Sequence, residues 1–337
     1  MKKWIGVDLH KRTFTVCIME GDEEKIKSYE VNRKGLERFK RELNKETEVA
    51  LETTGNSGYF YDEIVGKVKK VRLVNSLEFK AISSSTKKTD KNDARVICKH
   101  LRVGMLPEVR YVKEEERELR SLINLRDNLV KTRSGYKTRI DNVLSGIGEE
   151  EIRGEKGSKE YEEKIERLGI RESRKLEIKV MIRQIRVLNE EIKKLEEEIN
   201  GKGEKNKYHK GLTSIDGIGD LSATIIENAI VDIEDFEDEK KLCAYAGLVP
   251  KVRESGGKSK RGKLTKKGNK LLRTILVQAS FTAIRKNEAL RNFYNKIKAK
   301  KGSGKAIVAT ARKLLVIIYH TMKNSWVFKD FGNGVLA

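Results

Sequence analysis

The sequence predicts a mixed α/β domain followed by a region that is almost entirely α-helical. Short apolar runs joined by turns come first and then alternate with segments of helical spacing, as in a mixed sheet covered by helices. A long middle region then repeats apolar residues at a 3-4 spacing, which is typical of paired helices. We therefore expect three domains, at residues 1–110, 111–205 and 206–337.

Residues 1–110 carry three expected strands before the first expected helix, and strands and helices alternate afterwards. A start of this kind, rich in hairpins, favours a mixed sheet with helices on its faces. The expected strands are Trp4–Val7, Thr13–Met19, a segment near Lys27–Val31, Glu48–Leu51 and Val71–Val74. The expected helices are Lys34–Leu43, Tyr59–Val68 and Asp93–Arg102.

Residues 111–205 are expected to form two long helices joined by a polar turn, with a glycine-containing interruption near residues 154–158. Arg126 and Arg133 occupy two positions of the first apolar seam, and the second seam runs unbroken over Ile178–Ile199. The two helices can pair within the chain or form an intermolecular coiled coil. A spacer or dimerising arm is the simpler interpretation, and an RNA-binding surface that includes Arg126, Arg133 and Arg139 remains compatible with it.

Residues 206–337 follow a linker at Gly201–Lys207 and are expected to be mainly helical around one basic loop between Pro250 and Gly268. The sequence LTSIDGIGDLSA, residues 212–223, resembles a helix-hairpin-helix turn. In such a turn, glycines such as Gly217 and Gly219 let backbone N–H groups at a helix N-terminus contact a phosphate. An ordinary turn between two helices would show the same pattern.

The chain has 337 residues, of which 73 are Lys or Arg and 51 are Asp or Glu, so its formal net charge is +22. This excess indicates a polyanionic partner, with nucleic acid as the first candidate and an anionic membrane surface as the second. The apolar runs are too short for a transmembrane helix or a secretory signal. The three cysteines and four histidines are scattered without CxxC or HExxH spacing, so we expect a cytosolic protein without a disulfide framework or a cysteine zinc site.

Four acidic residues stand at the ends of expected elements: Asp8 and Glu52 end strands, and Asp90 and Asp93 mark a helix start in TDKNDAR. Functional side chains gather at strand ends of open α/β sheets, and four converging carboxylates would repel one another unless cations neutralised them. Mg²⁺ or Mn²⁺ fits this need, and two such ions can hold a phosphodiester in line for displacement. Taken singly, each acid could instead be solvated or, like Asp90, a helix cap.

The segment between Lys251 and Arg273 contains ten Lys or Arg residues and one acid, Glu254. Its glycines allow close approach of a partner, so the segment is suited to lie along phosphates. Ser255 stands in its middle and is either a hydrogen-bond donor to phosphate or a nucleophile, and Ser259 is a rival on the same grounds. The expected nucleic-acid contacts are Lys251, Arg253, Lys258, Lys260, Arg261, Lys263, Lys266, Lys267, Gly217 and Gly219.

Five motifs occur in the order GVDLHK, LETTG, KTDKNDA, SIDGIGDLSA and AYAGLVP…ESG…KRGKLTKKGNKLLR. Together they resemble the DEDD-type insertion-sequence transposases of the IS110 family, which are bridge-RNA-guided serine recombinases akin to the Piv-type DNA invertases. The resemblance covers nearly the whole chain. It implies a RuvC-like (RNase H-fold) domain, a coiled-coil arm and a C-terminal transposase domain for the three expected regions. One departure is Asp216, where relatives often carry proline before GIG.

The same resemblance implies a site and a reaction. Asp8, Glu52, Asp90 and Asp93 would form a metal-binding tetrad for Mg²⁺ or Mn²⁺, and Ser255 would be the nucleophile that becomes joined to cleaved DNA. Donor and target DNA, a noncoding bridge RNA and a homo-oligomer in which dimers form a tetramer with composite active sites are implied as partners. No membrane partner is expected, and no nucleotide cofactor, since the chain lacks a GxxxxGK[ST] loop. The setting would be the cytoplasm of a prokaryote, at the nucleoid.

Two other functions stay open from the sequence. A RuvC-like structure-selective nuclease would use metal and water, and Ser255 would then only contact phosphate. A non-catalytic nucleic-acid-binding scaffold would need neither the acids nor the serine.

Overall fold

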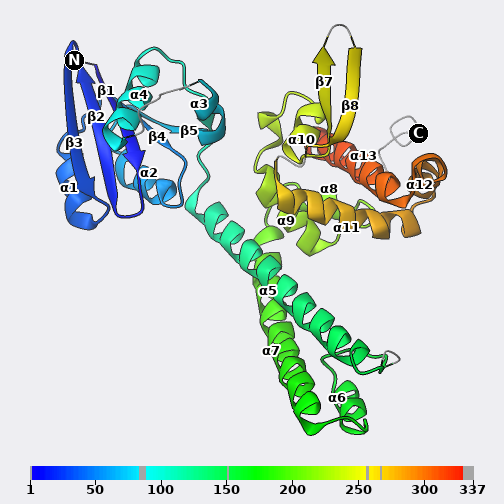
Figure 1. Ribbon diagram of the computed structural model, residues 1–337. Helices are drawn as coiled ribbons and strands as arrows, with labels where there is room; N and C mark the ends of the chain where they lie inside the picture. Colours follow the sequence, from blue (N-terminus) through cyan, green and yellow to red (C-terminus); the bar gives the residue numbers. More distant parts are fainter. Residues whose placement is uncertain (1, 83–88, 150–151, 256–257, 266–267, 329–337) are drawn as a thin grey trace. The chain divides into compact units, whose positions relative to one another are not determined.

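A computed structural model describes residues 2–82, 89–149, 152–255, 258–265 and 268–328. The chain divides into two compact units, Met1–Arg117 and Glu118–Ala337, which are described one by one (Figure 1). Among the described residues, no helix is long and apolar enough to cross a membrane. The division into three domains stays a prediction.

The first unit is built on a mixed sheet of six strands in the order β3-β2-β1-β4-β5-β6. β1 pairs parallel with β4, which pairs parallel with β5, whereas β2, β3 and β6 join antiparallel. The expected mixed α/β class is therefore confirmed. The strands are β1 (Lys3–Leu9), β2 (Thr13–Glu20), β3 (Glu23–Glu30), β4 (Thr47–Glu52), β5 (Lys70–Val74) and β6 (Glu108–Val109).

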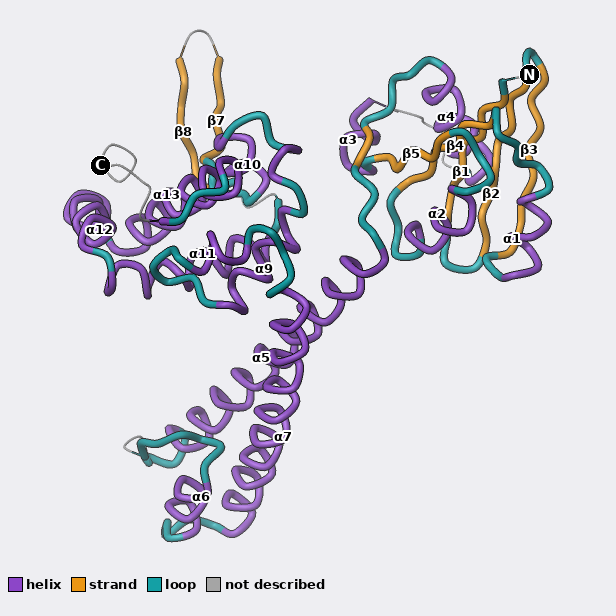
Figure 2. The backbone as a smooth tube through the Cα atoms, turned by 180° about the vertical axis from the view of Figure 1, so that it is seen from behind, coloured by secondary structure: helices purple, strands orange, loops and turns teal. Residues whose placement is uncertain are grey.

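Helices cover both faces of this sheet (Figure 2), and different side chains pack on the two faces. One face holds an aromatic core in which the Phe14 ring lies 5.3 Å from Phe39 and 4.9 Å from Phe60. The other holds small residues such as Ala94 and Cys98, which let a helix lie close. The helices are α1 (Arg33–Lys40) and α2 (Ser57–Val65) on the aromatic face, and α3 (Ser76–Ile82) and α4 (Asp90–Arg102) on the other.

Two long helices, α5 (Glu114–Ser145) and α7 (Glu172–Gly203), pack side by side in the second unit and run antiparallel (Figure 1). Both arginines of the first seam contact α7: Arg126 donates from Nε to Glu196 at 2.8 Å, and Arg133 donates to Asn189 at 2.8 Å. The two helices therefore pair within the chain. Their connection contains a further short helix, α6 (Lys159–Glu166), where the sequence predicts only a polar turn.

The helical core of the second unit surrounds α13, with Leu276 and Leu314 fully buried. α7 extends to Gly203, so the linker expected at Gly201–Lys207 is partly helical. A Cβ atom at Gly203 would lie 1.8 Å from Thr224 Oγ1, so glycine is what lets α7 and α9 approach there. The helices are α8 (His209–Thr213), α9 (Asp220–Ile230), a 3₁₀ turn (Ile233–Asp235), α10 (Glu239–Tyr245), α11 (Lys270–Lys286), α12 (Glu288–Lys301) and α13 (Ser303–Asn324).

The basic segment of the second unit forms a β-hairpin and not the loop that the sequence predicts (Figure 2). Its strands are β7 (Pro250–Ser255) and β8 (Lys258–Leu264), which pair antiparallel with an irregularity between Pro250 and Val252. Nine of the thirteen residues in the two strands are polar, so neither strand carries the apolar run or the sustained alternation that signals a strand.

Candidate functional site

Two acids of the first unit end neighbouring parallel strands. Val7 of β1 pairs with Leu51 of β4, and the next residues are Asp8 and Glu52. Val7 and Leu51 are buried against α1 and α2. Because side chains alternate along a strand, Asp8 and Glu52 lie on the opposite face, which α3 and α4 cover.

Gly6 brings the start of α4 to this strand end. A Cβ atom at Gly6 would lie 2.3 Å from the Ala94 carbonyl oxygen and 2.3 Å from the Cys98 nitrogen, so the helix backbone rests directly on β1. The side chain of Thr89 caps α4, so the cap that the sequence allows for Asp90 is wrong. Asp90 is instead the first residue of α4, and its carboxylate lies beside His10, just after β1.

Asp8, His10 and Asp90 form a compact group of potential metal ligands, with one ligand atom of each within 4.8 Å of the others. His10 Nε2 lies 3.1 Å from Asp8 Oδ2 and 3.4 Å from Asp90 Oδ1. The Asp8 side chain is 13% exposed, whereas those of His10 and Asp90 are at least half exposed. Asp8 is thus the buried member of the group, and His10 and Asp90 lie on its solvent-accessible side.

The pKa of the Asp8 carboxyl is raised to about 6: burial is the main cause, His10 opposes it, and the charges of Asp90, Asp93 and Glu52 add to it. The other three predicted acids therefore each act electrostatically on Asp8, although only Asp90 joins it in the compact group. Asp8 Oδ2 is buried without a hydrogen-bond donor. A buried carboxylate oxygen among like charges is stabilised by a cation, so these residues fit a divalent metal.

Ser255 belongs to the second unit and ends β7, where its backbone pairs with Lys258 of β8. The acids and Ser255 thus come from different compact units. Lys251 is exposed. Only the backbone is described for Ser255 and for Arg253, Lys258, Lys260, Arg261 and Lys263, and Lys266 and Lys267 lie outside the described residues.

The glycines of the GIG turn have separate roles. Gly217 has φ +94°, and a Cβ atom there would lie 2.5 Å from the Ala279 carbonyl oxygen, so the turn packs closely on α11. Gly219 stands at the N-cap of α9 with open space around it and no side-chain cap. Asp216 accepts a hydrogen bond from Asn287 Nδ2 at 3.1 Å, which ties the turn to the start of α12.

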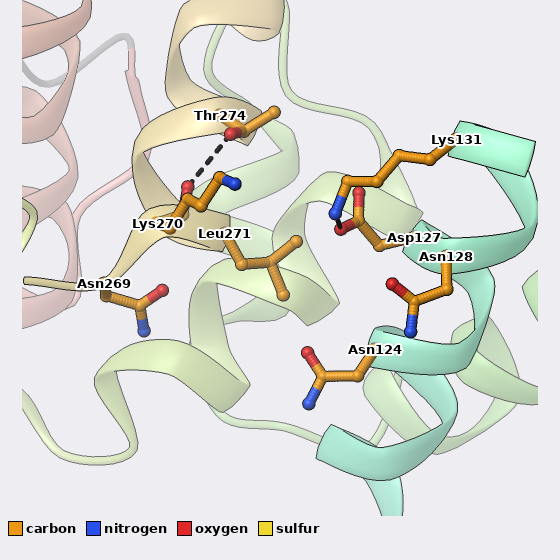
Figure 3. A pocket seen from close by; sticks show the side chains of 8 residues that line it. All are labelled: Asn124, Asp127, Asn128, Lys131, Asn269, Lys270, Leu271 and Thr274. Atoms are coloured by element: carbon orange, nitrogen blue, oxygen red, sulfur yellow. Dashed lines mark hydrogen bonds and ion pairs between the residues drawn. The ribbon is translucent and has the colours of Figure 1, made fainter. Parts of the chain in front are cut away.

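A polar cavity of about 380 Å³ lies between α5 and the start of α11, at the end of the basic segment (Figure 3). Figure 3 shows Lys131 reaching Asp127 across one turn of α5, opposite Lys270 on α11. Amide and ammonium groups of this kind contact phosphates and sugars in protein–DNA interfaces. The lining residues are Asn124, Asp127, Asn128, Lys131, Asn269, Lys270, Leu271 and Thr274.

A second buried acid–histidine pair lies in the helical core of the second unit. Glu227 on α9 is 3% exposed, and neither of its carboxylate oxygens has a hydrogen-bond partner. His209 Nδ1 lies 3.6 Å from Glu227 Oε2, and its Nε2 lies 3.1 Å from Asp220 Oδ1. Burial raises the pKa of Glu227 to about 7, and His209 opposes the increase.

Neither histidine is predicted as a site residue from the sequence, because the four histidines are far apart along the chain. His10 is two residues from Asp8 in GVDLH, and that closeness is the signal that could have identified it. Nothing comparable points to His209, since Glu227 lies 18 residues away and meets it only through the fold.

Two family models match the chain. One, a transposase model for the DEDD type of IS110, matches residues 5–149, and the other, described as the transposase IS116/IS110/IS902 family, matches residues 209–295. The chain is 27% identical to the transposase for insertion sequence element IS1111A of Coxiella burnetii, over 94% of this chain and 88% of that protein.

Two further relatives extend over nearly the whole chain. The probable family 20 transposase of Pseudomonas aeruginosa is 24% identical over 96% of this chain and 98% of its own length. The pilin gene-inverting protein of Moraxella bovis is 24% identical over 97% of this chain and 98% of its own length. The family resemblance of the five motifs is thereby confirmed, and the chain belongs to the IS110 family of DEDD transposases.

Proposed function

We propose that this transposase uses a divalent-metal centre formed by Asp8, Glu52, Asp90 and Asp93. The family makes the chain an enzyme that cuts and rejoins DNA. The observation that supports the centre most strongly is the buried Asp8 oxygen without a hydrogen-bond donor, beside Asp90. Mg²⁺ or Mn²⁺ held there would stabilise the charge that develops on the phosphate. Acids at the ends of β1 and β4 also support a RuvC-like fold.

The second part of the proposal is covalent catalysis by Ser255. Its hydroxyl attacks the phosphorus of a DNA phosphodiester, so that an O–P bond forms and the P–O bond to one DNA end breaks. The Ser255 proton is transferred to that departing oxygen, which becomes a free hydroxyl. A hydroxyl of another DNA end then attacks the phosphoserine ester and restores Ser255. The ester conserves the bond energy, so the reaction needs no nucleotide cofactor.

Donor and target DNA, guided by a noncoding bridge RNA, are the proposed partners. The net charge of +22 and the basic hairpin support nucleic-acid binding, and the RNA rests on the family resemblance alone. A homo-oligomer is supported by apolar side chains on the long helices, since Leu125 is 48% and Leu176 is 59% exposed. Because the relatives are bacterial transposases, we place the reaction in the prokaryotic cytoplasm, at the nucleoid.

The test is the trapping of a protein–DNA adduct. The protein is incubated with its RNA, end-labelled donor and target DNA and Mg²⁺, and then denatured. The wild type should give a labelled adduct and S255A should give none. S259A is the control and should keep the adduct, since Ser259 lies on the facing strand, next to the residue that pairs with Ser255. Omission of the RNA should also abolish it.

An adduct that survives in S255A would overturn the nucleophile. Cleavage without any adduct would favour the structure-selective nuclease. Unchanged activity in D8N would favour the non-catalytic scaffold. An adduct of undiminished yield without RNA would overturn guidance and leave the serine chemistry standing.

A further inference from the structure

His10 is held by its backbone at the entrance of the acidic group. Its N–H donates to the Thr13 carbonyl at 2.9 Å, and its carbonyl accepts from Asn56 Nδ2 at 3.0 Å. Asn56 stands at the N-cap of α2, yet its side chain makes no cap hydrogen bond and instead holds His10 and Thr54. The loop after β1 is therefore fixed to the start of α2, which holds the backbone of His10 beside the acids that its imidazole faces.

The spacing of the donor atoms matches one coordination sphere. Adjacent ligands of a six-coordinate ion with bonds of about 2.1 Å stand about 3 Å apart. His10 Nε2 lies 3.1 Å from one Asp8 oxygen and 3.4 Å from one Asp90 oxygen. The Asp8 oxygen that faces His10 is the buried one that lacks a hydrogen-bond donor.

The chemistry of the donors also separates two classes of metal. Mg²⁺ prefers oxygen ligands, whereas a first-row transition metal gains from an imidazole nitrogen. A purely acidic tetrad has no such nitrogen. Adding His10 to Asp8 and Asp90 gives a mixed set of nitrogen and oxygen donors.

We propose that His10 supplies a nitrogen ligand to the cation held by Asp8 and Asp90, so that the centre favours a divalent transition metal over Mg²⁺. This inference rests on the proposed metal centre and adds a ligand to it. His10 thereby becomes a determinant of which metal the transposase uses.

The test uses Mn²⁺ alone as the probe, on the full chain. Electron spin-echo modulation of bound Mn²⁺ should show a ¹⁴N coupling in the wild type that is lost in H10N. Mn²⁺ affinity should fall at least about tenfold in H10N, as loss of even an outer partner of a metal ligand costs that much. Mg²⁺ affinity, measured by competition, should change less than about threefold. H320N, altered in the second unit, is the matched control and should behave as the wild type.

The outcomes separate the ligand from the centre. A ¹⁴N coupling that persists in H10N, or is absent in the wild type, would overturn the role of His10 while Mn²⁺ still binds. An equal loss of Mn²⁺ and Mg²⁺ affinity in H10N would overturn the metal preference. Mn²⁺ binding that is unchanged in D8N would instead overturn the proposed centre. Thermal unfolding of H10N should match the wild type, because the His10 side chain is half exposed.

Discussion

Each unit of this transposase contains a buried acid beside a histidine, and the two pairs differ in what surrounds them. Asp8 lies at a strand end among three more carboxylates, with an open entrance formed by His10 and Asp90. Glu227 lies in the middle of α9, and it and His209 are both buried in the helical core. Burial raises the pKa of both acids, so a raised pKa does not distinguish a catalytic acid from a structural one.

What distinguishes them is the neighbouring charge and the access. Around Asp8, negative charges accumulate where solvent can deliver a cation, so a bound cation would relieve the repulsion. Around Glu227, His209 lies between the buried carboxylate and the exposed Asp220, and no further carboxylate accumulates beside it, so a proton is enough to neutralise Glu227. We therefore expect the first arrangement to bind a cation and the second to act on stability.

Among the variants outside the compact group of Asp8, His10 and Asp90, the largest effect is expected for the two acids that act on Asp8 from a distance. E52Q and D93N should each slow DNA strand cleavage at least about 100-fold. When catalytic groups act as a unit, loss of one member can cost about as much as loss of them all. Cleavage of labelled donor DNA measures this, and E227Q is the matched change of a buried carboxyl to an amide. Rates within twofold of the wild type in both variants would remove Glu52 and Asp93 from the site.

A substitution at Gly6 tests whether the close approach of α4 to β1 is what brings the acids together. G6A should destabilise the protein by about 3 kcal/mol, because a methyl group would meet the α4 backbone, and the displaced helix should also weaken Mn²⁺ binding. Denaturant unfolding and metal titration measure the two effects. G66A is the control, since nothing lies within 4 Å of the added carbon. Equal unfolding midpoints for G6A and G66A would contradict the close approach of α4 to β1.

The raised pKa of Glu227 predicts that the stability of the folded chain depends on pH. This pKa is about 7 in the folded chain against an ordinary 4.5, so the folded state binds the proton more tightly. This stabilisation is complete below pH 4.5 and is lost as the pH rises through 7. E227Q should therefore gain at most about 3 kcal/mol over the wild type at pH 8 and nothing at pH 4.5. Unfolding at both pH values measures it, with exposed E190Q as control, and a gain that is independent of pH would contradict the assignment.

The smallest expected effect on the fold concerns the long helices. L176D should reduce the molar mass seen by light scattering and change the stability of the chain by less than about 0.5 kcal/mol, because the side chain is 59% exposed. R183D, on the same helix and also exposed, should leave the mass unchanged. A wild-type mass in L176D would exclude this face of α7 from the oligomer contact.

The sequence predicts the first sheet well because its strands are short apolar runs joined by turns and its helices keep a 3-4 spacing. The five expected strands are present, and α4 begins at Asp90, three residues earlier than expected, because Thr89 caps it. β6 and α3 are too short to leave a periodic pattern. The sequence does not predict the hairpin of β7 and β8, because most of its residues are polar and it contains no apolar run.

The candidate site also has a part that the sequence predicts and a part that it does not. Strand ends and the DxxD spacing identify Asp8, Glu52, Asp90 and Asp93 as candidates without any coordinates. The sequence does not show that Gly6 sets the distance between β1 and α4, or that the His10 ring faces two of the acids. The first depends on Gly6 meeting Ala94 and Cys98, 88 and 92 positions away, and the second on Asp90, 80 positions from His10. The role of Ser255 stays a prediction that the adduct experiment decides.

The central claim is that the acids around Asp8 perform metal-dependent chemistry, whereas the buried acid of the second unit does not. The most direct measurement is the rate of donor DNA cleavage by D8N and by E227Q, over a range of Mg²⁺ and Mn²⁺ concentrations. We expect D8N to be at least about 1000-fold slower at every metal concentration and E227Q to stay within twofold of the wild type. Cleavage by D8N at the wild-type rate would contradict the account.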